Sequence, residues 1–492
     1  MRSMYLAVPS VARRMRKMCA LGTAVVVGLQ FAEVPVASAQ TLRQALAAAY
    51  RYNPQIDAER ARLRATDESV SQAHAGYRPS LNGSASVAGQ DTNIRSSIVS
   101  PFSQGGSLTP RGYSITAQQN LFNGFRTTNQ VKEAEANVRA ARESLRDIER
   151  RILLQAVTAF MDVVRDQSII RLQENNLRVL TRTLRATQDR FSVGEVTRTD
   201  VAQARASRAS AVAALDLAKA NLQNSRESYR RIVGTAPSRL QEASPPNRRL
   251  PKTSRAAVQI AMNENPLIIA ALYREQAARA AVDRIRGELL PSVDVEASYS
   301  DQFDTSQTTQ ETETTSITGR LNVPLYAEGG AVFSRVRAAK HTHVSRLQEI
   351  EQIRTEQRET VVTAFTTLQA NRAQLRSNAI EVQSNRIALN GVREEEKVGQ
   401  RTLLDVLDAE QALLNSQVTQ ATTRRDIVVA AYTVLANMGR LDAATLDGVG
   451  EVYDPEVHYF EVRRKWWGVN ITREDGRREF FDFWPTHGRH YK

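Results

Sequence analysis

Two aspartates, Asp405 and Asp408, have the spacing of side chains that share one face of a helix. Carboxylates in this arrangement attract cations, although on a single exposed helix such a pair is usually just a solvated surface. The equivalent positions of an earlier, similar segment hold Asp200 and Gln203, so only the later copy carries the pair. Any chemistry at these carboxylates therefore depends on what surrounds the helix.

The histidines, glycines and cysteine offer no catalytic arrangement. His341 and His343 are two residues apart on an expected helix, which directs their rings to different faces and argues against a metal site. The chain has neither a phosphate-cradling glycine loop nor a nucleophile elbow. Its single cysteine, Cys19, excludes disulfides and cysteine metal sites. The sequence therefore predicts no enzyme, no cofactor and no bound metal.

Composition favours a folded protein of more than one domain. The chain has 492 residues, of which 41% are apolar and 24% charged, too well patterned for a disordered protein. Its formal net charge of +13 is spread along stretches of mixed sign. A solvated surface is therefore favoured over a nucleic-acid patch.

The first 39 residues have the pattern of an export signal. A basic run precedes the apolar stretch 20–31, and the Ala-Ser-Ala sequence at 37–39 offers the small residues at which a signal peptidase cleaves. We expect the mature chain to begin at Gln40 without a lipid anchor, because the residues before Cys19 do not form a lipoprotein signal. The apolar stretch is shorter than the roughly 20 residues of a spanning helix, and no other segment comes closer. We therefore expect no transmembrane helix.

The sequence contains an internal duplication. VGEVTRTDVAQA, from Val193, resembles VGQRTLLDVLDA, from Val398, and Gly234 matches Gly439 at the same offset of 205 residues. A proline-rich stretch separates the halves and is incompatible with a continuous helix. The predicted parts are a signal peptide (1–39), a first repeat (40–236), a linker (237–252), a second repeat (253–441) and a C-terminal periplasmic extension (442–492).

Each half contains one very long helical stretch, in which apolar residues recur first at steps of three and four and then at steps of seven. Between Thr127 and Arg190 there is neither proline nor glycine, which predicts a helix of about 95 Å at 1.5 Å per residue. Gly194 and Gly399 end the long helices, and Thr199 precedes the next apolar run. Each copy of the repeated motif is therefore expected to be the tip of an antiparallel helical hairpin.

Four short segments between the helices alternate apolar and polar residues, as β-strands do. They cover residues 81–90, 113–122, 293–299 and 317–325. A soluble two-sided sheet would show the same alternation, but the signal peptide and the polar stretches between paired strands favour an outer-membrane barrel. Four strands cannot close a barrel that needs about eight. Subunits are therefore expected to share one, with eight strands from two chains or twelve from three.

These features together resemble the TolC-like outer-membrane channels, also called outer membrane efflux proteins. The likeness covers roughly residues 42–441 and rests on the paired Asn-Pro dipeptides, RPSL and LPSV before strands, LFNGFR and LYAEGG before long helices, and the VG…DV tips. The resemblance implies an α+β membrane protein. Three internally duplicated chains would form a twelve-stranded outer-membrane β-barrel, continuous with a twelve-helix periplasmic α-barrel of coiled-coil helices.

The resemblance also implies partners. Such a homotrimer would be the exit duct of a tripartite export system. It would dock with a periplasmic adaptor (membrane fusion) protein and with an inner-membrane ABC or proton-driven transporter, for type I protein secretion, multidrug efflux or both. The partner transporter would select the cargo, which the sequence of the duct does not specify.

The resemblance assigns roles to residues near the tips. The expected adaptor-docking residues are Val193, Gly194, Val398 and Gly399. The expected closed-state links between neighbouring helices are Thr199, Asp200 and Arg401, while Glu396 stands where the family has a tyrosine. In a tunnel that narrows at its tips, Asp405 and Asp408 of three copies would form a ring of six carboxylates, which favours cations.

A second class of protein fits part of the same pattern. A structural or adhesive coiled-coil protein anchored in the outer membrane would show similar heptads. It would carry a barrel segment at one end of the chain, whereas here strand pairs occur at matching places in both halves.

The residues after Leu441 lie outside the duplication. They include all three tryptophans, Trp466, Trp467 and Trp484, in a stretch that mixes basic and aromatic residues without a clear period. A loosely ordered periplasmic extension is favoured over a dedicated docking element.

Overall fold

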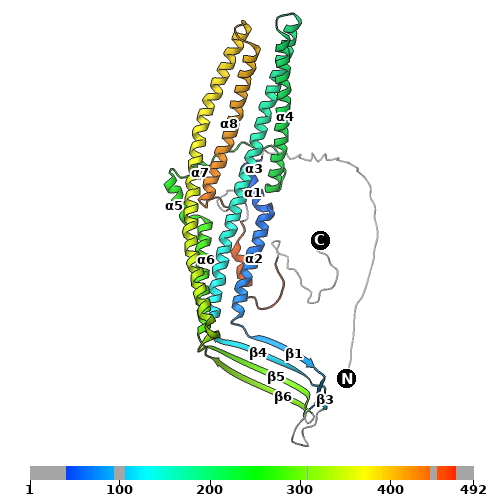
Figure 1. Cartoon of the computed structure of the whole chain (residues 1–492), viewed down its shortest axis with the longest axis vertical. Helices are drawn as coiled ribbons and strands as arrows, with labels where there is room; N and C mark the ends of the chain where they lie inside the picture. Colours follow the sequence, from blue (N-terminus) through cyan, green and yellow to red (C-terminus); the bar gives the residue numbers. More distant parts are fainter. Residues whose placement is uncertain (1–39, 94–105, 307–308, 444–451, 473–492) are drawn as a thin grey trace, which may run out of the picture. The chain divides into compact units, whose positions relative to one another are not determined.

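The computed structural model describes residues 40–93, 106–306, 309–443 and 452–472. The expected signal peptide and Trp484 lie outside these ranges. The described residues belong to one contact unit, in which long helices lead away from a small antiparallel sheet (Figure 1). Among the described helices, none is long and apolar enough to cross a membrane.

The two halves have the same order of elements. The first consists of α1 (Leu42–Tyr52), α2 (Pro54–Ala75), β1 (Ser80–Val87), β4 (Arg111–Asn123), α3 (Arg126–Ser192) and α4 (Arg198–Val233). The second consists of α5 (Ser254–Glu264), α6 (Pro266–Arg286), β5 (Ser292–Ser306), β6 (Thr309–Asn322), α7 (Ala331–Lys397) and α8 (Leu403–Asn437). Additional short elements are β2 (Gln90–Thr92), β3 (Gly106–Leu108), the 3₁₀ turns η1 (Asn247–Arg249), η2 (Gly287–Leu289) and η3 (Ala327–Gly330), and α9 (Pro455–Val462).

The repeated Asn-Pro dipeptides begin α2 and α6 in the same way. Asn53 and Asn265 cap these helices, and the proline that follows each is suited to the first helical position. The Asn53 amide also donates a hydrogen bond of 2.9 Å to the Ile232 carbonyl near the end of α4. Asn265 donates at 2.9 Å to the Asn437 carbonyl at the end of α8. In each half the dipeptide thus fastens the start of a short helix to the end of the returning helix.

Two matched glycines complete these junctions. Gly234 and Gly439 both have φ of 82°, in the left-handed region, just beyond α4 and α8. A Cβ on Gly439 would lie 2.4 Å from the Glu264 carbonyl oxygen, and one on Gly234 would lie 2.9 Å from Tyr52 Cβ. Backbone conformation and close approach both require glycine here.

The long helices exceed the predicted length. α3 and α7 have 67 residues each, or about 100 Å at 1.5 Å per residue. Each packs against its returning helix, α4 or α8, and α6 lies between α3 and α7 (Figure 1). The main apolar core lies where the two hairpins meet α1. Its largest buried side chains include Tyr50, Phe160, Tyr229, Leu368 and Leu435.

The four main strands form one antiparallel sheet in the order β1-β4-β5-β6. Its register pairs Tyr113 with Asp301, and Tyr299 with Thr315. β1 and β6 are the outer strands, and each is paired on one side only within the described chain. The sheet is open at both edges.

The predicted strands of the second half are too short. β5 has 15 residues and β6 has 14, and both continue into the polar stretch that was expected to be a loop. Threonine-rich segments form strands without an apolar face because β-branched side chains suit the extended backbone. β6 ends at Asn322 rather than 325, since Pro324 cannot donate to the ladder. The corresponding stretch of the first half contains β2 and β3, while 94–105 lie outside the described residues.

The C-terminal extension differs from its prediction. Over residues 452–472 it is docked rather than loosely ordered, because α9 packs against α2. Tyr459 lies on the apolar cluster of Val70, Ala73, Ala134 and Val138. The contact depends on single aromatic and charged side chains, which have no periodic pattern in the sequence.

Candidate functional site

The repeated motif forms the turns that join α3 to α4 and α7 to α8. Gly194 N–H donates to the Phe191 carbonyl at 3.0 Å, and Gly399 N–H donates to the Glu396 carbonyl at 3.0 Å. Their φ values, 80° and 78°, are in the left-handed region. A Cβ at either glycine would meet nothing within 4 Å. Glycine is therefore favoured by the backbone conformation of the turn and not by lack of space.

A valine precedes each glycine and is exposed. The exposed fraction is 77% for Val193 and 71% for Val398. Two large apolar side chains thus lie in the turns between α3 and α4 and between α7 and α8, at equivalent positions of the two repeats. The two exposed valine side chains are therefore available for apolar contact with any partner that approaches the tips.

Each returning helix begins with a capping box. The Asp200 carboxylate accepts from Thr197 N–H at 2.8 Å, and that of Asp405 accepts from Thr402 N–H at 2.9 Å. The threonine hydroxyl of each pair in turn accepts from the aspartate N–H. The cap of α4 is thus Thr197, and Thr199 lies inside the first helical turn. Each aspartate has a structural role within its own hairpin.

The two carboxylates of the expected pair, Asp405 and Asp408, have different surroundings. Asp405 is engaged by the cap, and the hydrogen bonds from Thr402 hold the pKa of Asp405 below its usual value. Asp408 lies one turn further along α8 and is exposed. Both carboxylates lie on α8, and the described residues contain no cluster of three or more acidic, histidine or cysteine side chains that could hold a metal ion.

An ion pair joins the tips of the two hairpins. Arg190, near the end of α3, lies with Nη1 2.6 Å from Oε1 of Glu396, near the end of α7. The same guanidinium contacts Glu195 in its own turn at 2.8 Å. These carboxylates raise the pKa of Arg190, with Glu396 as the main cause. We call the contact between Arg190 and Glu396 the tip ion pair.

Within the described chain, Arg401 contacts a carboxylate of its own hairpin. Its Nε donates to Glu395 Oε2 at 3.0 Å, within the second hairpin. Asp200 is bound to Thr197 in the first hairpin. Asp200 and Arg401 are therefore not paired with each other within the described chain, and a link between them would join neighbouring copies.

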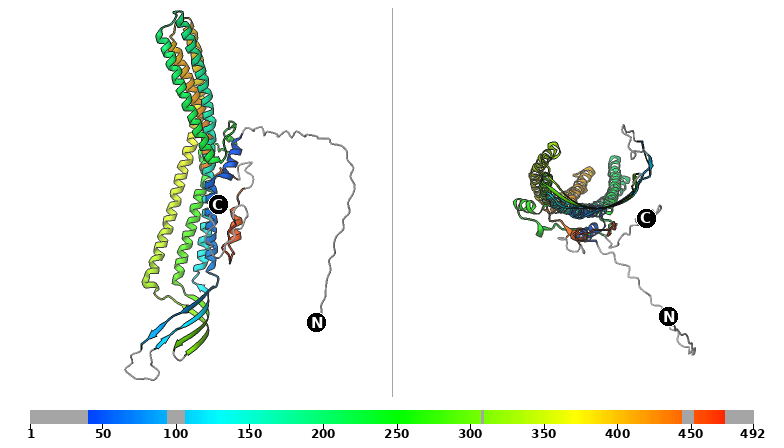
Figure 2. Two further views of the ribbon diagram at one scale, coloured as in Figure 1. Left: turned by 90° about the vertical axis from the view of Figure 1, so that its right-hand side faces the viewer. Right: turned by 90° about the horizontal axis from the view of Figure 1, so that it is seen from below.

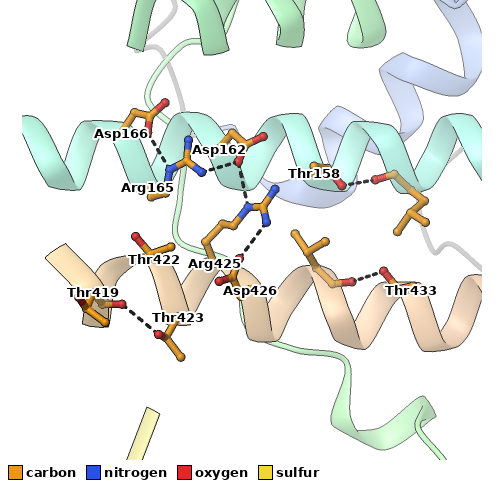
Figure 3. Close-up of polar contacts among 12 residues, drawn as sticks. Thr158, Asp162, Arg165, Asp166, Thr419, Thr422, Thr423, Arg425, Asp426 and Thr433 are labelled. Atoms are coloured by element: carbon orange, nitrogen blue, oxygen red, sulfur yellow. Dashed lines mark hydrogen bonds and ion pairs between the residues drawn. The ribbon is translucent and has the colours of Figure 1, made fainter. Parts of the chain in front are cut away.

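Further from the tips, a charged network joins α3 to α8 (Figure 3). Asp162 accepts from Arg425 Nε at 2.9 Å and pairs with Arg165 Nη1 at 3.1 Å. Arg425 also pairs with Asp426 at 2.8 Å, and Arg165 with Asp166 at 2.8 Å. The Arg425–Asp162 ion pair thus links helices from different repeats, and the other two residues that contact it belong to the same two helices. We call these residues the mid-helix network.

Comparison with known proteins identifies the fold and its class. The family described as outer membrane efflux protein matches residues 34–235 and 257–440. The chain belongs to this family. The unmatched residues between the two ranges include the whole of the predicted linker, 237–252.

Individual proteins and structures similar to this efflux-family protein support the same family assignment. The outer membrane efflux protein BepC of Brucella suis is 37% identical over 443 residues, which are 90% of this chain and 94% of BepC. The alkaline protease secretion protein AprF of Pseudomonas aeruginosa is 25% identical, over 68% of this chain and 70% of AprF. The crystal structure of the Campylobacter jejuni CmeC outer membrane channel has the same fold. Its TM-score is 0.72 at 15% identity, over 86% of this chain and 89% of that one.

Membership establishes where this efflux-family protein resides and what class it belongs to. The family consists of outer-membrane efflux channels, which are not enzymes, and its members extend into the periplasm. The mostly helical structure with a small sheet is that of a TolC-type channel.

Sequence reasoning missed the basic half of the tip ion pair. The internal repeat gave no signal for it, because the position equivalent to Arg190 is Glu395, which contacts Arg401, and the position equivalent to Glu396 is Phe191. The mid-helix network had no signal either, since its residues are ordinary helix-surface types.

Proposed function

We propose that this protein is the outer-membrane exit duct of a tripartite export system, in which three copies close one barrel. The observation that supports the proposal most is the open sheet, whose outer strands β1 and β6 each have one unpaired edge within the described chain. Lipid offers no hydrogen bonds to such edges. Pairing β1 of one copy with β6 of the next would satisfy both edges.

Three copies fit a duct better than two. Two copies would give eight strands, and side chains fill the interior of a barrel of that size. Three copies would give twelve strands and leave room for passage. The helices α3, α4, α7 and α8 of three copies would continue the wall as a periplasmic tunnel of twelve helices.

In this proposal the tips meet the partners. Val193, Gly194, Val398 and Gly399 would contact a periplasmic adaptor, and the adaptor would connect the duct to an inner-membrane ABC or proton-driven transporter. BepC is named for efflux and AprF for secretion of a protease. Both classes of cargo therefore fit a duct of this kind. We assign no catalytic, cofactor or metal role to any residue.

The proposal is tested on the purified full-length protein. Chemical crosslinking in detergent should give a trimer, and the same preparation should conduct ions in a planar bilayer. Monomers or dimers alone would reject the shared twelve-stranded barrel. Trimers without conductance would favour the alternative, a structural or adhesive coiled-coil protein.

A further inference from the structure

The residues after α9 form a closed loop. Lys465 Nζ donates to the Asn470 carbonyl at 2.6 Å, and Thr472 Oγ1 donates to Glu461 Oε1 at 2.9 Å. Gly468 has φ of 96° and makes the turn in the left-handed region, which favours glycine. We call residues 463–472 the C-terminal loop.

Helix α9 fixes the position of this loop. His458 Nδ1 lies 3.0 Å from Oδ2 of Asp67, which is fully buried in α2. Arg463 pairs with Glu135 of α3 at 3.1 Å, and its guanidinium lies over the Tyr459 ring. Because these contacts are made with two helices of the first repeat, the loop has a defined place on the body of the protein.

That place is next to the start of β1. Arg78, two residues before β1, donates through Nη1 to the Lys465 carbonyl at 2.9 Å. The Arg78 guanidinium also lies 4.9 Å from the ring centre of Trp466. In the view from below, α9 lies on the convex side of the curved wall, away from its hollow (Figure 2). The loop is therefore outside the expected duct, where the helices give way to the sheet.

The loop presents an apolar surface with basic residues. The exposed fraction is 88% for Trp467, 64% for Trp466, 62% for Val469 and 54% for Ile471. Arg464 is exposed beside them. Near the strand, Tyr77 and Leu81 are also exposed. Apolar side chains gathered in this way indicate a binding surface.

A membrane surface fits this composition and place. Tryptophan with lysine or arginine is typical of the boundary between a bilayer and water, where the ring enters the headgroup region and the cations face anionic lipid. The helix-proximal ends of the strands face the periplasm in an outer-membrane channel whose helices extend into that compartment. We propose that the C-terminal loop is an interfacial anchor whose Trp467 enters the periplasmic phospholipid leaflet of the outer membrane. This inference rests on the proposed barrel.

The test places one tryptophan in the full-length protein. Trp466→Phe with Trp484→Phe leaves Trp467 as the sole fluorophore and keeps an aromatic ring beside Arg78. The protein is reconstituted in nanodiscs of phosphatidylethanolamine and phosphatidylglycerol, with and without bromine on the upper acyl chains. Bromolipid should quench the emission at least twofold, and acrylamide in the water should quench it weakly.

A matched probe serves as control. Val457→Trp, in a protein whose three natural tryptophans are phenylalanine, places the fluorophore on α9 at a site 66% exposed in the natural protein. Its neighbour Glu456 pairs with Arg142, further from the strands. Bromolipid should leave this probe unquenched while acrylamide quenches it.

Two outcomes would overturn the anchor. Quenching of Trp467 by acrylamide but not by bromolipid would place it in water, and quenching by neither would place it under protein, such as a neighbouring copy. Conductance of the same preparation tests the duct separately. Channel conductance without quenching of Trp467 by bromolipid would reject the anchor and leave the duct. Quenching of Trp467 by bromolipid without conductance would reject the duct and leave the anchor.

Discussion

Glu396 accepts a hydrogen bond of 2.6 Å from Arg190 and thereby joins the ends of α7 and α3. The contact connects two hairpins that are otherwise linked near their tips by apolar packing of Leu180, Ala211 and Leu407. The charged contact ties the two hairpins together within one copy.

The first prediction is that loss of the tip ion pair makes the channel leak. A partly exposed pair of this kind contributes about 0.5–1 kcal/mol. We therefore expect Arg190→Ala or Glu396→Ala to raise resting open probability about two- to fivefold if opening separates the hairpins. The measurement is single-channel recording at neutral pH. Lys397→Gln is the control, because the Lys397–Glu394 pair lies within one helix.

A double variant makes this prediction sharper. If Arg190 and Glu396 act through each other, Arg190→Ala with Glu396→Ala should leak no more than either single variant. Additive leakage would mean that the two residues act independently, and the tip ion pair would then not hold the hairpins together.

The second prediction concerns links between copies. If Arg401 reaches Asp200 of a neighbouring copy, Arg401→Ser and Asp200→Asn should raise leakage of a large antibiotic into cells to a similar degree. Glu395→Gln should then have little effect. If Glu395→Gln matches Arg401→Ser and Asp200→Asn is silent, Arg401 acts only within its own turn, as in the single chain.

Much of the fold could be predicted because the sequence is internally duplicated, so that each half carries the same motifs. The Asn-Pro dipeptides and the junction glycines matched in sequence, and the structure shows why, since Asn53 and Asn265 bind the ends of the returning helices. The length of α3 followed from the absence of proline and glycine between Thr127 and Arg190, whereas α7 continues through Gly391. A short motif is weak evidence for a structural element by itself. The same motif at the matching position of the second repeat makes that evidence much stronger.

The features that were missed do not repeat or have no period. β5 and β6 run through a threonine-rich stretch with no apolar face, so alternation understated their length. α9 is held by isolated contacts such as His458 with Asp67. The tip ion pair needs residues 206 positions apart, and only the shape of the folded hairpins brings them together.

The third prediction concerns docking at the tips. Val193→Asp with Val398→Asp places charge on two exposed apolar side chains and should abolish export while trimers stay in the membrane. Neither valine is buried, so we expect little loss of stability. The measurements are drug susceptibility of cells and trimer abundance on native gels. Val457→Asp, at an equally exposed valine away from the tips, should export normally; normal export by the tip variant would argue against docking there.

The fourth prediction concerns pH and the buried Glu149 of α3. Burial raises its pKa to about 7, and Arg60 and Tyr50 offset this only in part. A carboxyl with a raised folded pKa contributes stability below its unfolded pKa, and that contribution is lost as pH rises toward 7. Glu149→Gln should therefore raise the free energy of unfolding at pH 8, by at most about 3 kcal/mol, and change it little at pH 4.5.

The measurement for Glu149 is loss of helical circular dichroism on heating, at several pH values. Glu227→Gln is the control, because Glu227 forms an exposed pair with Arg230 on α4 and should show no such pH dependence. A gain of stability in Glu149→Gln that is equal at pH 4.5 and pH 8 would mean that the buried charge is not its cause.

The last prediction separates the two carboxylates of α8. Asp405 closes a capping box, so its replacement loosens the start of α8 as well as removing a charge. Asp408 is exposed one turn later, so Asp408→Asn removes only charge. If three copies converge at the tips, this variant deletes three of six carboxylates, and cation preference should fall by roughly half. Reversal potentials across a salt gradient measure the preference, and block by a trivalent metal complex should weaken in parallel. Asp216→Asn, at an exposed aspartate of α4 outside the turns, is the control. An Asp408→Asn channel as cation-selective and as easily blocked as the parent would place the selective ring elsewhere on the wall.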